Sequence, residues 1–326
     1  MSKPKVFLTR IILEPGLIMI QDVCEADIWP DELPPSHAEI MAHMPGCTGL
    51  VCLLSDRIDL DVMESAGYRL KVISAYSAGV DNVDVAVATA RGIPVGNTPG
   101  CLTDATADMA FALLLAAARR VVEGDRLVKN GGWKTWGPDF MLGADLRGST
   151  LGIIGYGRIG QAVARRAAGF GMRIIYTDPH PAGSEVGGQA EAVDLDTLLR
   201  SSDFISLHTA LTPTTRGLMD ASAFAKMKPT AVLVNTSRGP VVDQRALFEA
   251  LSTGRIFAAA LDVTDPEPLP VTDPLLTLEN CIVVPHMASA SRQSRSDMSL
   301  LAAENLIAGL KGERLPNCVN PEVYRL

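Results

Sequence analysis

Three ionisable residues in the second half of the chain have the side chains needed to move a proton and hold an anion. Arg238 stands in the run Thr-Ser-Arg-Gly, Glu267 lies between two prolines, and His286 follows a proline. A histidine exchanges protons near neutral pH, and a carboxylate bonded to its imidazole orients the ring and favours the protonated form. A guanidinium can grip a carboxylate with two hydrogen bonds and polarise a carbonyl group. Each residue alone is more often structural, but together they fit reversible hydride transfer between a nicotinamide and a 2-oxo acid.

The segment Gly155-Tyr156-Gly157-Arg158-Ile159-Gly160 has the spacing of a phosphate-binding loop. It follows an apolar run, Leu151–Ile154, and precedes an expected helix, Gln161–Phe170. Glycines there allow a tight turn and a close approach of backbone to a pyrophosphate at the helix N-terminus. The alternative is a glycine turn without a ligand, which the strand–turn–helix context disfavours.

Asp178 comes 18 residues after Gly160, at the end of the expected strand Arg173–Thr177. A carboxylate at that place accepts hydrogen bonds from the ribose hydroxyls of an adenosine and repels a 2′-phosphate. The residues that follow it contain no arginine or lysine until Arg200. The sequence therefore favours NAD over NADP, unless His180 or Arg158 accommodates the phosphate.

These residues need a scaffold that brings strand ends together. Short apolar runs alternate with stretches of helical period, which is typical of βαβ units and parallel sheets, whose ligands bind at the carboxyl ends of the strands. The first hundred residues contain expected strands at Lys5–Leu8, Gly49–Leu54, Leu70–Ala75 and Ile93–Val95, and expected helices at Pro35–His43, Leu60–Ala66 and Val83–Ala90. From Thr150 a second series has six expected strands, at Leu151–Ile154, Arg173–Thr177, Phe204–His208, Ala231–Asn235, Phe257–Asp262 and Cys281–Val284.

The rest of the chain connects or completes these two series. Leu102–Arg120 is expected to be one long helix, because polar residues start it and an Ala/Leu run fills it. Asn130–Gly148 is rich in Trp and Gly and predicts an irregular segment. Gln293–Lys311 has helical spacing and is expected to return to the first series.

Composition limits the class of protein. The 326 residues are 47% hydrophobic and 20% charged, enough for two packed domains and too little charge for disorder. A formal net charge of −8 argues against nucleic-acid and membrane-surface partners. The longest apolar run, Met109–Ala118, is too short to span a bilayer, and no signal peptide is evident. The six scattered cysteines without C-x-x-C spacing predict a reducing cytoplasm and no metal site.

Several short stretches form one joint pattern: Ala78–Asn82, Leu102–Asp108, Gly155–Gly160, Ser237–Gly239, Asp262–Glu267 and Pro285–His286. In this pattern the chain resembles the D-isomer-specific 2-hydroxyacid dehydrogenase family over essentially its whole length. Within that family it is most similar to the glyoxylate/hydroxypyruvate reductases, through Leu53–Asp56, Val128–Trp133, Asp262–Thr264, Pro266–Pro270 and Met298–Ala303.

The resemblance implies an α/β fold of two doubly wound parallel-sheet domains. A Rossmann cofactor domain, residues 101–289, would be inserted into a flavodoxin-like substrate domain made of residues 1–100 and 290–326. The chain would then cross between the domains twice, near residues 99–101 and 288–291.

The resemblance also implies roles for particular residues. Arg238, Glu267 and His286 would be the catalytic set, and the substrate would contact Leu54, the backbone N–H groups of Ala78 and Gly79, Arg238 and His286. Residues implied to bind the cofactor are Thr106, Gly155, Gly157, Arg158, Ile159, Gly160, Asp178, Thr236, Asp262 and Ala288, with Asp262 on the nicotinamide side. A homodimer would form through an arm, Gly131–Gly143, in which Trp136 either enters the partner's site or only anchors the interface.

Two departures from the family pattern bear on cofactor and substrate. Ala288 stands where members usually have glycine, which adds a methyl group beside the expected nicotinamide position. Asp178 stands where related reductases often carry arginine and use NADP, so NADH is expected to be preferred, with NADP as the second choice. The expected substrate is a small 2-oxo acid. The alternatives are a reductase of larger acids such as 2-ketogluconate, and an NAD(H)-sensing protein like the C-terminal binding protein corepressors.

Overall fold

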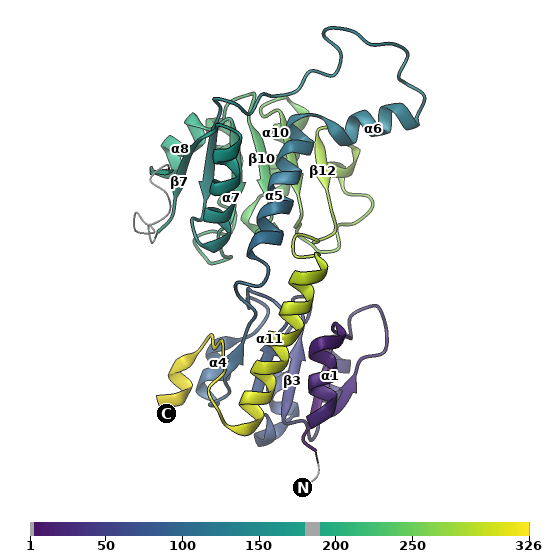
Figure 1. The fold of residues 1–326 in the computed structure, drawn as a ribbon, viewed down its shortest axis with the longest axis vertical. Helices are drawn as coiled ribbons and strands as arrows, with labels where there is room; N and C mark the ends of the chain where they lie inside the picture. The colour runs from purple at the N-terminus through teal and green to yellow at the C-terminus, as the bar shows by residue number, and fades with distance from the viewer. Residues whose placement is uncertain (1–2, 180–189, 326) are drawn as a thin grey trace. The chain divides into compact units, whose positions relative to one another are not determined.

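The computed structural model describes residues 3–179 and 190–325. The chain divides into two compact units, each with its own sheet (Figure 1). Unit 1 comprises Met1–Leu102 and Ala290–Leu326, and unit 2 comprises Thr103–Ser289. The long C-terminal helix therefore belongs to the same unit as the first hundred residues.

Unit 1 is built on a parallel sheet with the strand order β2-β1-β3-β4-β5. This is the flavodoxin-like order, in which the strands run 2-1-3-4-5. The strands are β1 (Lys5–Leu8), β2 (Glu25–Ile28), β3 (Gly49–Cys52), β4 (Val72–Ala75) and β5 (Val95–Gly96). The helices are α1 (Glu14–Val23), α2 (His37–His43), α3 (Leu60–Ser65), α4 (Val85–Ala90) and α11 (Arg292–Lys311), with short 3₁₀ turns at Gly67–Arg69 and Pro321–Arg325.

The central strands of unit 1 are buried on both faces, because helices cover the sheet on two sides. All residues of β3 and β4 are buried, as expected for a doubly wound parallel sheet. Helix α11 packs against α1, where a Cβ on Gly16 would overlap the carbonyl oxygen of Ser299. Glycine is therefore required at that helix crossing.

Unit 2 contains a parallel sheet in the order β12-β11-β10-β9-β6-β7-β8. Numbered from β6, this is the Rossmann order 3-2-1-4-5-6 with one more strand at the end. The strands are β6 (Thr150–Ile154), β7 (Arg173–Thr177), β8 (Ala190–Ala192), β9 (Phe204–Leu207), β10 (Val232–Asn235), β11 (Ala258–Leu261) and β12 (Cys281–Val283). The helices are α5 (Thr103–Ala118), α6 (Val121–Lys129), α7 (Arg158–Gly169), α8 (Leu195–Ser201), α9 (Ala221–Lys226) and α10 (Gln244–Ser252), with 3₁₀ turns at Gly239–Val241 and Pro274–Thr277.

The expectation of two doubly wound parallel sheets is confirmed, but the expected count of six strands in the second sheet is wrong. The described part of unit 2 has a seventh strand, β8, whose sequence Ala-Glu-Ala has no β-branched residue and which lies at the sheet edge. Helices α1 and α6 and strand β2 were also not expected. α1 contains a proline and a glycine, which disfavour a helix prediction, and α6 has no buried residue.

None of the described helices is long and apolar enough to cross a membrane.

Candidate active site

The glycine loop joins β6 to α7, and the surroundings of its three glycines differ. Gly155 has a φ of 92°, in the left-handed region, and a Cβ there would lie 2.6 Å from the backbone of His208 at the end of β9. A Cβ on Gly160 would overlap the carbonyl oxygen of Gly155. A Cβ on Gly157 would meet nothing within 4 Å. Packing within the chain therefore explains two of the glycines but leaves Gly157 facing open space.

The residues around Gly157 fit the pyrophosphate of a dinucleotide. Helix α7 begins at Arg158, directly after Gly157, and its first backbone N–H groups have no acceptor within the helix. Those N–H groups and the helix dipole attract an anion, and the missing side chain of Gly157 leaves room for it. The loop also lies beside the boundary between β6 and β9, where the strand order of the sheet reverses and such sheets bind ligands.

Asp178 follows β7 and helps to shape this loop. One of its carboxylate oxygens accepts a hydrogen bond from the backbone N–H of Tyr156, at 2.7 Å. The Tyr156 ring is buried and stacks on Tyr176 with ring centres 3.9 Å apart. The carboxylate therefore lies directly beside the loop, as a group that recognises the adenosine ribose must.

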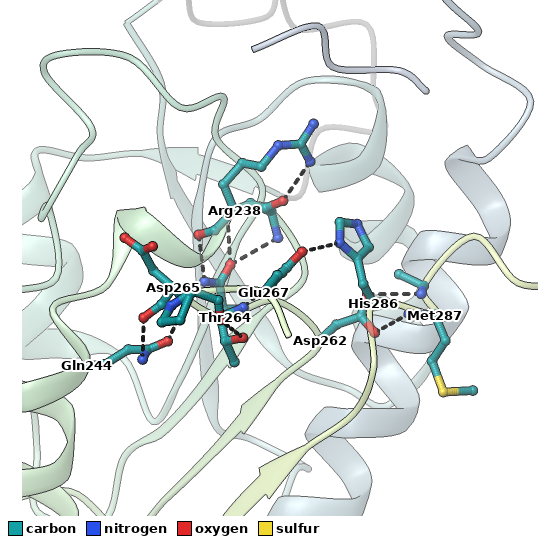
Figure 2. Close-up of polar contacts among 12 residues, drawn as sticks. Arg238, Gln244, Asp262, Thr264, Asp265, Glu267, His286 and Met287 are labelled. Carbon is teal, nitrogen blue, oxygen red and sulfur yellow. Dashed lines mark hydrogen bonds and ion pairs between the residues drawn. The ribbon is translucent and has the colours of Figure 1, made fainter. Parts of the chain in front are cut away.

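His286 and Glu267 form a hydrogen-bonded pair (Figure 2). Nδ1 of His286 lies 2.9 Å from a carboxylate oxygen of Glu267, and the two side chains are 25% and 31% exposed. His286 follows β12 and Glu267 follows β11, so neighbouring strands deliver the two groups to the same edge of the sheet. The partly exposed imidazole can exchange a proton with a ligand while one of its ring nitrogens faces the carboxylate.

Glu267 is held ionised by its neighbours. Burial opposes its charge, but the hydrogen bond and charge of His286, the Thr264 N–H and the nearby charge of Arg238 outweigh burial and hold the pKa of Glu267 below its ordinary value. The Thr264 N–H donates to the carboxylate oxygen that does not face His286, at 2.9 Å. Gln244 braces the same loop by bonding to both backbone groups of Asp265. Both carboxylate oxygens of Glu267 are therefore oriented.

Asp262 holds the backbone of the His286 loop. Its carbonyl oxygen accepts from the His286 N–H at 2.9 Å, and its carboxylate accepts from the N–H groups of Met287 at 2.7 Å and Ala288 at 2.9 Å. His286 has a φ of 48°, a left-handed conformation that is uncommon for residues other than glycine. Burial raises the pKa of the Asp262 carboxyl, while the two N–H groups oppose that rise. Asp262 thus fixes a backbone conformation that would otherwise be unfavourable.

Arg238 follows β10, the strand next to β11. Its carbonyl oxygen accepts from the side-chain amide of Asn235 at 2.9 Å, and its guanidinium donates to the Ser237 carbonyl at 2.9 Å. A Cβ on Gly239 would overlap the carbonyl oxygen of Thr264, so only glycine lets this loop pack against the loop that leads to Glu267. Figure 2 shows the side chains of Arg238 and His286 on the same side of the Thr264–Glu267 loop.

The other residues expected at the cofactor all belong to unit 2. Thr106, Thr236 and Ala288 are buried, Arg158 is exposed, and Ile159 is partly buried. Thr236 contacts a histidine that the sequence did not single out: Oγ1 of Thr236 lies 3.5 Å from Nδ1 of His208, whose Nε2 lies 2.8 Å from the Ser206 hydroxyl. Burial lowers the pKa of His208 to about 3, so this imidazole is neutral near pH 7.

Leu54, Ala78 and Gly79 belong to unit 1. Leu54 follows β3 and is 40% exposed, while Ala78 and Gly79 follow β4. The side-chain amide of Asn82 donates to the carbonyl oxygens of Leu53 at 2.8 Å and Asp56 at 2.7 Å, which fixes the turn that carries Leu54.

No group of three or more His, Cys, Asp or Glu side chains that could hold a metal ion occurs within residues 3–179 and 190–325. His180, which the sequence offered as a residue that could accommodate a 2′-phosphate, lies outside the described residues.

Residues 111–288 match the model of the NAD-binding domain of the D-isomer specific 2-hydroxyacid dehydrogenases. The chain belongs to this family. It is 54% identical to a glyoxylate reductase of Korarchaeum cryptofilum (strain OPF8), over 99% of this chain and 98% of the relative. The TT0316 protein of Thermus thermophilus has the same fold, with a TM-score of 0.91 and 46% identity over 97% of this chain and 99% of that one.

One further structure bears on the cofactor. An NADPH-dependent glyoxylate/hydroxypyruvate reductase from Sinorhizobium meliloti, solved with NADP and malonate, has a TM-score of 0.86 and 31% identity over 98% of each chain. Membership of this family makes the chain an NAD-binding oxidoreductase that acts on a CH–OH group, as the sequence predicted.

The supporting residues were harder to find than the charged ones. Asn235, Thr264 and Gln244 act through bonds to backbone or to carboxylate oxygens, and such bonds leave no spacing pattern. For Asn235 one signal was available, because it is a polar residue at the end of an otherwise apolar strand.

Proposed function

We propose that this chain reduces small 2-oxo acids, glyoxylate and hydroxypyruvate first, to the corresponding 2-hydroxy acids with NADH. The observation that carries the proposal is the His286–Glu267 pair, with Nδ1 of the imidazole 2.9 Å from the carboxylate. Arg238 follows the strand next to the one that leads to Glu267. The names of the relatives support this substrate class, since one is a glyoxylate reductase and another a glyoxylate/hydroxypyruvate reductase.

His286 supplies the proton in this reaction. Because Nδ1 faces Glu267, Nε2 on the other side of the ring donates the proton to the carbonyl oxygen of the substrate. The contacts that lower the pKa of Glu267 keep it ionised, so a negative charge faces Nδ1 of His286. In the reverse direction, Nε2 takes the proton back from the hydroxyl group.

Arg238 holds the substrate and stabilises the charge that develops on it. Its guanidinium can bind the carboxylate with two hydrogen bonds and polarise the adjacent carbonyl. When bound, the reduced nicotinamide supplies the hydride that adds to the carbonyl carbon. Asp262 keeps the His286 loop in place through the N–H groups of Met287 and Ala288.

The backbone of Ala78 and Gly79 in unit 1 also takes part in holding the substrate carboxylate, and Leu54 contributes an apolar contact. Neutral backbone N–H groups can bind an anion without a charged side chain.

NADH is the preferred cofactor in this proposal, held by the glycine loop, Arg158, Ile159, Thr106 and Thr236. Asp178 beside the Tyr156 N–H favours the two ribose hydroxyls of NAD and repels the 2′-phosphate of NADP. The Asp178→Arg variant should raise the ratio of kcat/KM with NADPH to that with NADH at least about tenfold, because repulsion is replaced by attraction. An unchanged ratio would mean that Asp178 does not meet the ribose.

The function is tested by oxidation of NADH and NADPH, each with glyoxylate, hydroxypyruvate and 2-ketogluconate. We expect turnover with NADH and the two small acids. Turnover mainly with 2-ketogluconate would replace the proposal with a reductase of larger sugar acids. No turnover with any acid, together with NADH-dependent capture of a protein partner, would favour a sensing protein instead.

The chain acts as a homodimer joined through the arm Gly131–Gly143. This segment follows α6 and stands away from the sheet and helices of unit 2 as an extended loop (Figure 1). It exposes Trp133, Trp136, Phe140 and Leu142, with Trp136 77% exposed. α6, the helix that leads into the arm, has no buried residue. Exposed aromatic side chains gathered on one segment call for a partner.

Light scattering after gel filtration tests the dimer. The double variant Trp133→Ser with Trp136→Ser should weaken self-association at least about tenfold, because two large apolar anchors are lost. Tyr68→Ser is the matched control, since Tyr68 is fully exposed but lies in unit 1. A monomeric wild type, or equal weakening by the control, would contradict the assignment to the arm.

A further inference from the structure

The turn after β4 has three consecutive peptide groups whose carbonyl oxygens are all held. The Ser77 carbonyl accepts from the backbone N–H of Thr98 at 2.8 Å, and the Ala78 carbonyl accepts from the side-chain amide of Asn97 at 2.7 Å. The Gly79 carbonyl accepts from the Ser77 hydroxyl at 2.7 Å. Two side chains and one backbone group thus fix this turn.

The N–H ends of the same peptide groups are free. Among the described residues, none accepts a hydrogen bond from the backbone N–H of Ala78, Gly79 or Val80. A trans peptide is planar, with its C=O and N–H pointing in opposite directions, so holding each carbonyl also aims the N–H of the next residue. Three adjacent N–H groups that are aimed but unpaired form a site for an anion.

Asn97 is itself firmly placed. Its carbonyl oxygen accepts from the side-chain amide of Asn305 at 2.9 Å, and Asn305 on α11 is fully buried. The other end of the Asn305 amide accepts from the backbone N–H of Asn317 at 3.0 Å. A Cβ on Gly96 would lie 2.8 Å from the Asn305 side chain, so β5 and α11 pack as closely as their backbones allow. The backbone of Asn97 is therefore held firmly against α11, and this places its side-chain amide.

We propose that Asn97, with Ser77, is a positioning residue for the substrate carboxylate. Its amide holds the Ala78 carbonyl, and this orients the Gly79 N–H toward the bound anion and keeps the carbonyl dipole turned away from it. The inference rests on the proposed function, because it takes the carboxylate of a 2-oxo acid as the anion. Asn97 does not touch the reacting atoms and acts only through the backbone of Ala78 and Gly79.

The test separates KM from kcat. Asn97→Ala should raise the KM for glyoxylate about tenfold, change kcat less than about threefold, and leave the Kd for NADH unchanged. Asn97→Asp should raise KM further, because its carboxylate repels both the Ala78 carbonyl and the incoming anion. Ser77→Ala should raise KM in the same direction by a smaller factor, and it serves as a second variant if Asn97→Ala folds poorly.

Asn320→Ala is the matched control. Asn320 is a buried amide of unit 1 that also donates to a backbone carbonyl, that of Ile93 at 3.0 Å. Its loss should lower the Tm without raising KM. A KM that is unchanged in Asn97→Ala, or that rises equally in Asn320→Ala, would overturn the positioning role.

A binding measurement makes the inference independent of turnover. Oxalate added to protein labelled with ¹⁵N should shift the amide resonances of Ala78 and Gly79, with a Kd about tenfold weaker in Asn97→Ala. Absence of these shifts in the wild type would overturn the anion site. Shifts in a wild type that does not reduce any 2-oxo acid would contradict the proposed function while keeping Asn97 in its place.

Discussion

At the sheet edge of unit 2 the groups held in place are charged side chains, whereas at the edge of unit 1 they are backbone N–H groups. The carboxylates of Asp262 and Glu267 accept from the N–H groups of Met287, Ala288 and Thr264. In unit 1, Asn97 and Ser77 donate instead to the carbonyl oxygens of Ala78 and Gly79. Both arrangements lie beyond the carboxyl ends of parallel strands. The same type of sheet edge thus positions groups for proton transfer in unit 2 and for anion binding in unit 1.

The difference follows from what each edge has to provide. Proton transfer needs a side chain that can gain and lose a proton, and backbone groups cannot do this near neutral pH. Gripping an anion needs only donors aimed in the right direction, which backbone N–H groups can supply. Single substitutions should therefore change the chemistry at the edge of unit 2 and mainly change affinity at the edge of unit 1.

The largest expected effect is at the histidine. His286→Ala should lower kcat with NADH and glyoxylate about 1000-fold, because the carbonyl oxygen loses its proton donor. The Kd for NADH, followed by nucleotide fluorescence, should stay within about twofold, since the imidazole is assigned to the substrate. A kcat within about tenfold of the wild type would mean that another group supplies the proton and would break the contrast between the two edges.

A substitution that preserves charge comes next. Arg238→Lys should lower kcat/KM about 100-fold, because an ammonium group cannot reproduce the two parallel hydrogen bonds of a guanidinium. Arg245→Lys is the matched control, since Arg245 lies on α10 and its side chain is 90% exposed. Equal activity of Arg238→Lys and wild type would show that only the charge at this position matters.

Parts of this comparison could be predicted from the sequence. Arg238, Glu267 and His286 were predicted at strand ends because each lies in the loop that follows an apolar run. Strand β8 was not predicted because it buries no residue and has no β-branched side chain, whereas helix α6 was overlooked although its sequence is amphipathic. The hydrogen bonds from the Met287 N–H to Asp262 and from Asn97 to the Ala78 carbonyl were not predicted either. Every residue type has a backbone carbonyl, and all but proline have an N–H, so such bonds leave no signal in the sequence of the partner.

The Glu267→Gln variant tests the ion pair. The amide removes the negative charge that faces Nδ1 of His286, so the variant should lose about tenfold in kcat/KM near pH 7. Glu249→Gln, on the exposed side of α10, should leave kcat/KM unchanged. A kcat/KM for Glu267→Gln equal to that of the wild type would show that the carboxylate only orients the ring.

Stability gives a second measure of the same pair. The pKa of Glu267 is lowered in the folded protein, so its ionisation stabilises the fold above its ordinary pKa, and this contribution is lost as the pH falls through the lowered value. The Tm of Glu267→Gln should therefore lie below that of the wild type near pH 7, and the gap should narrow in acid. A gap that stays constant with pH would assign the loss to packing instead.

The smallest expected effect is at Ala288. Its substitution by glycine tests how strongly activity depends on the side chain at a position that contributes a backbone N–H. Ala288 is 6% exposed, and its N–H donates to Asp262, so Ala288→Gly keeps the hydrogen bond and removes only the methyl group. The added backbone freedom should lower the free energy of unfolding by about 0.5–1 kcal/mol and kcat by less than about threefold. A change in the KM for NADH of more than about tenfold would place the methyl group against the nicotinamide. The variant keeps every charged group of unit 2. A small effect would therefore show that the charged side chains carry out the chemistry at this edge and that the backbone holds them in place.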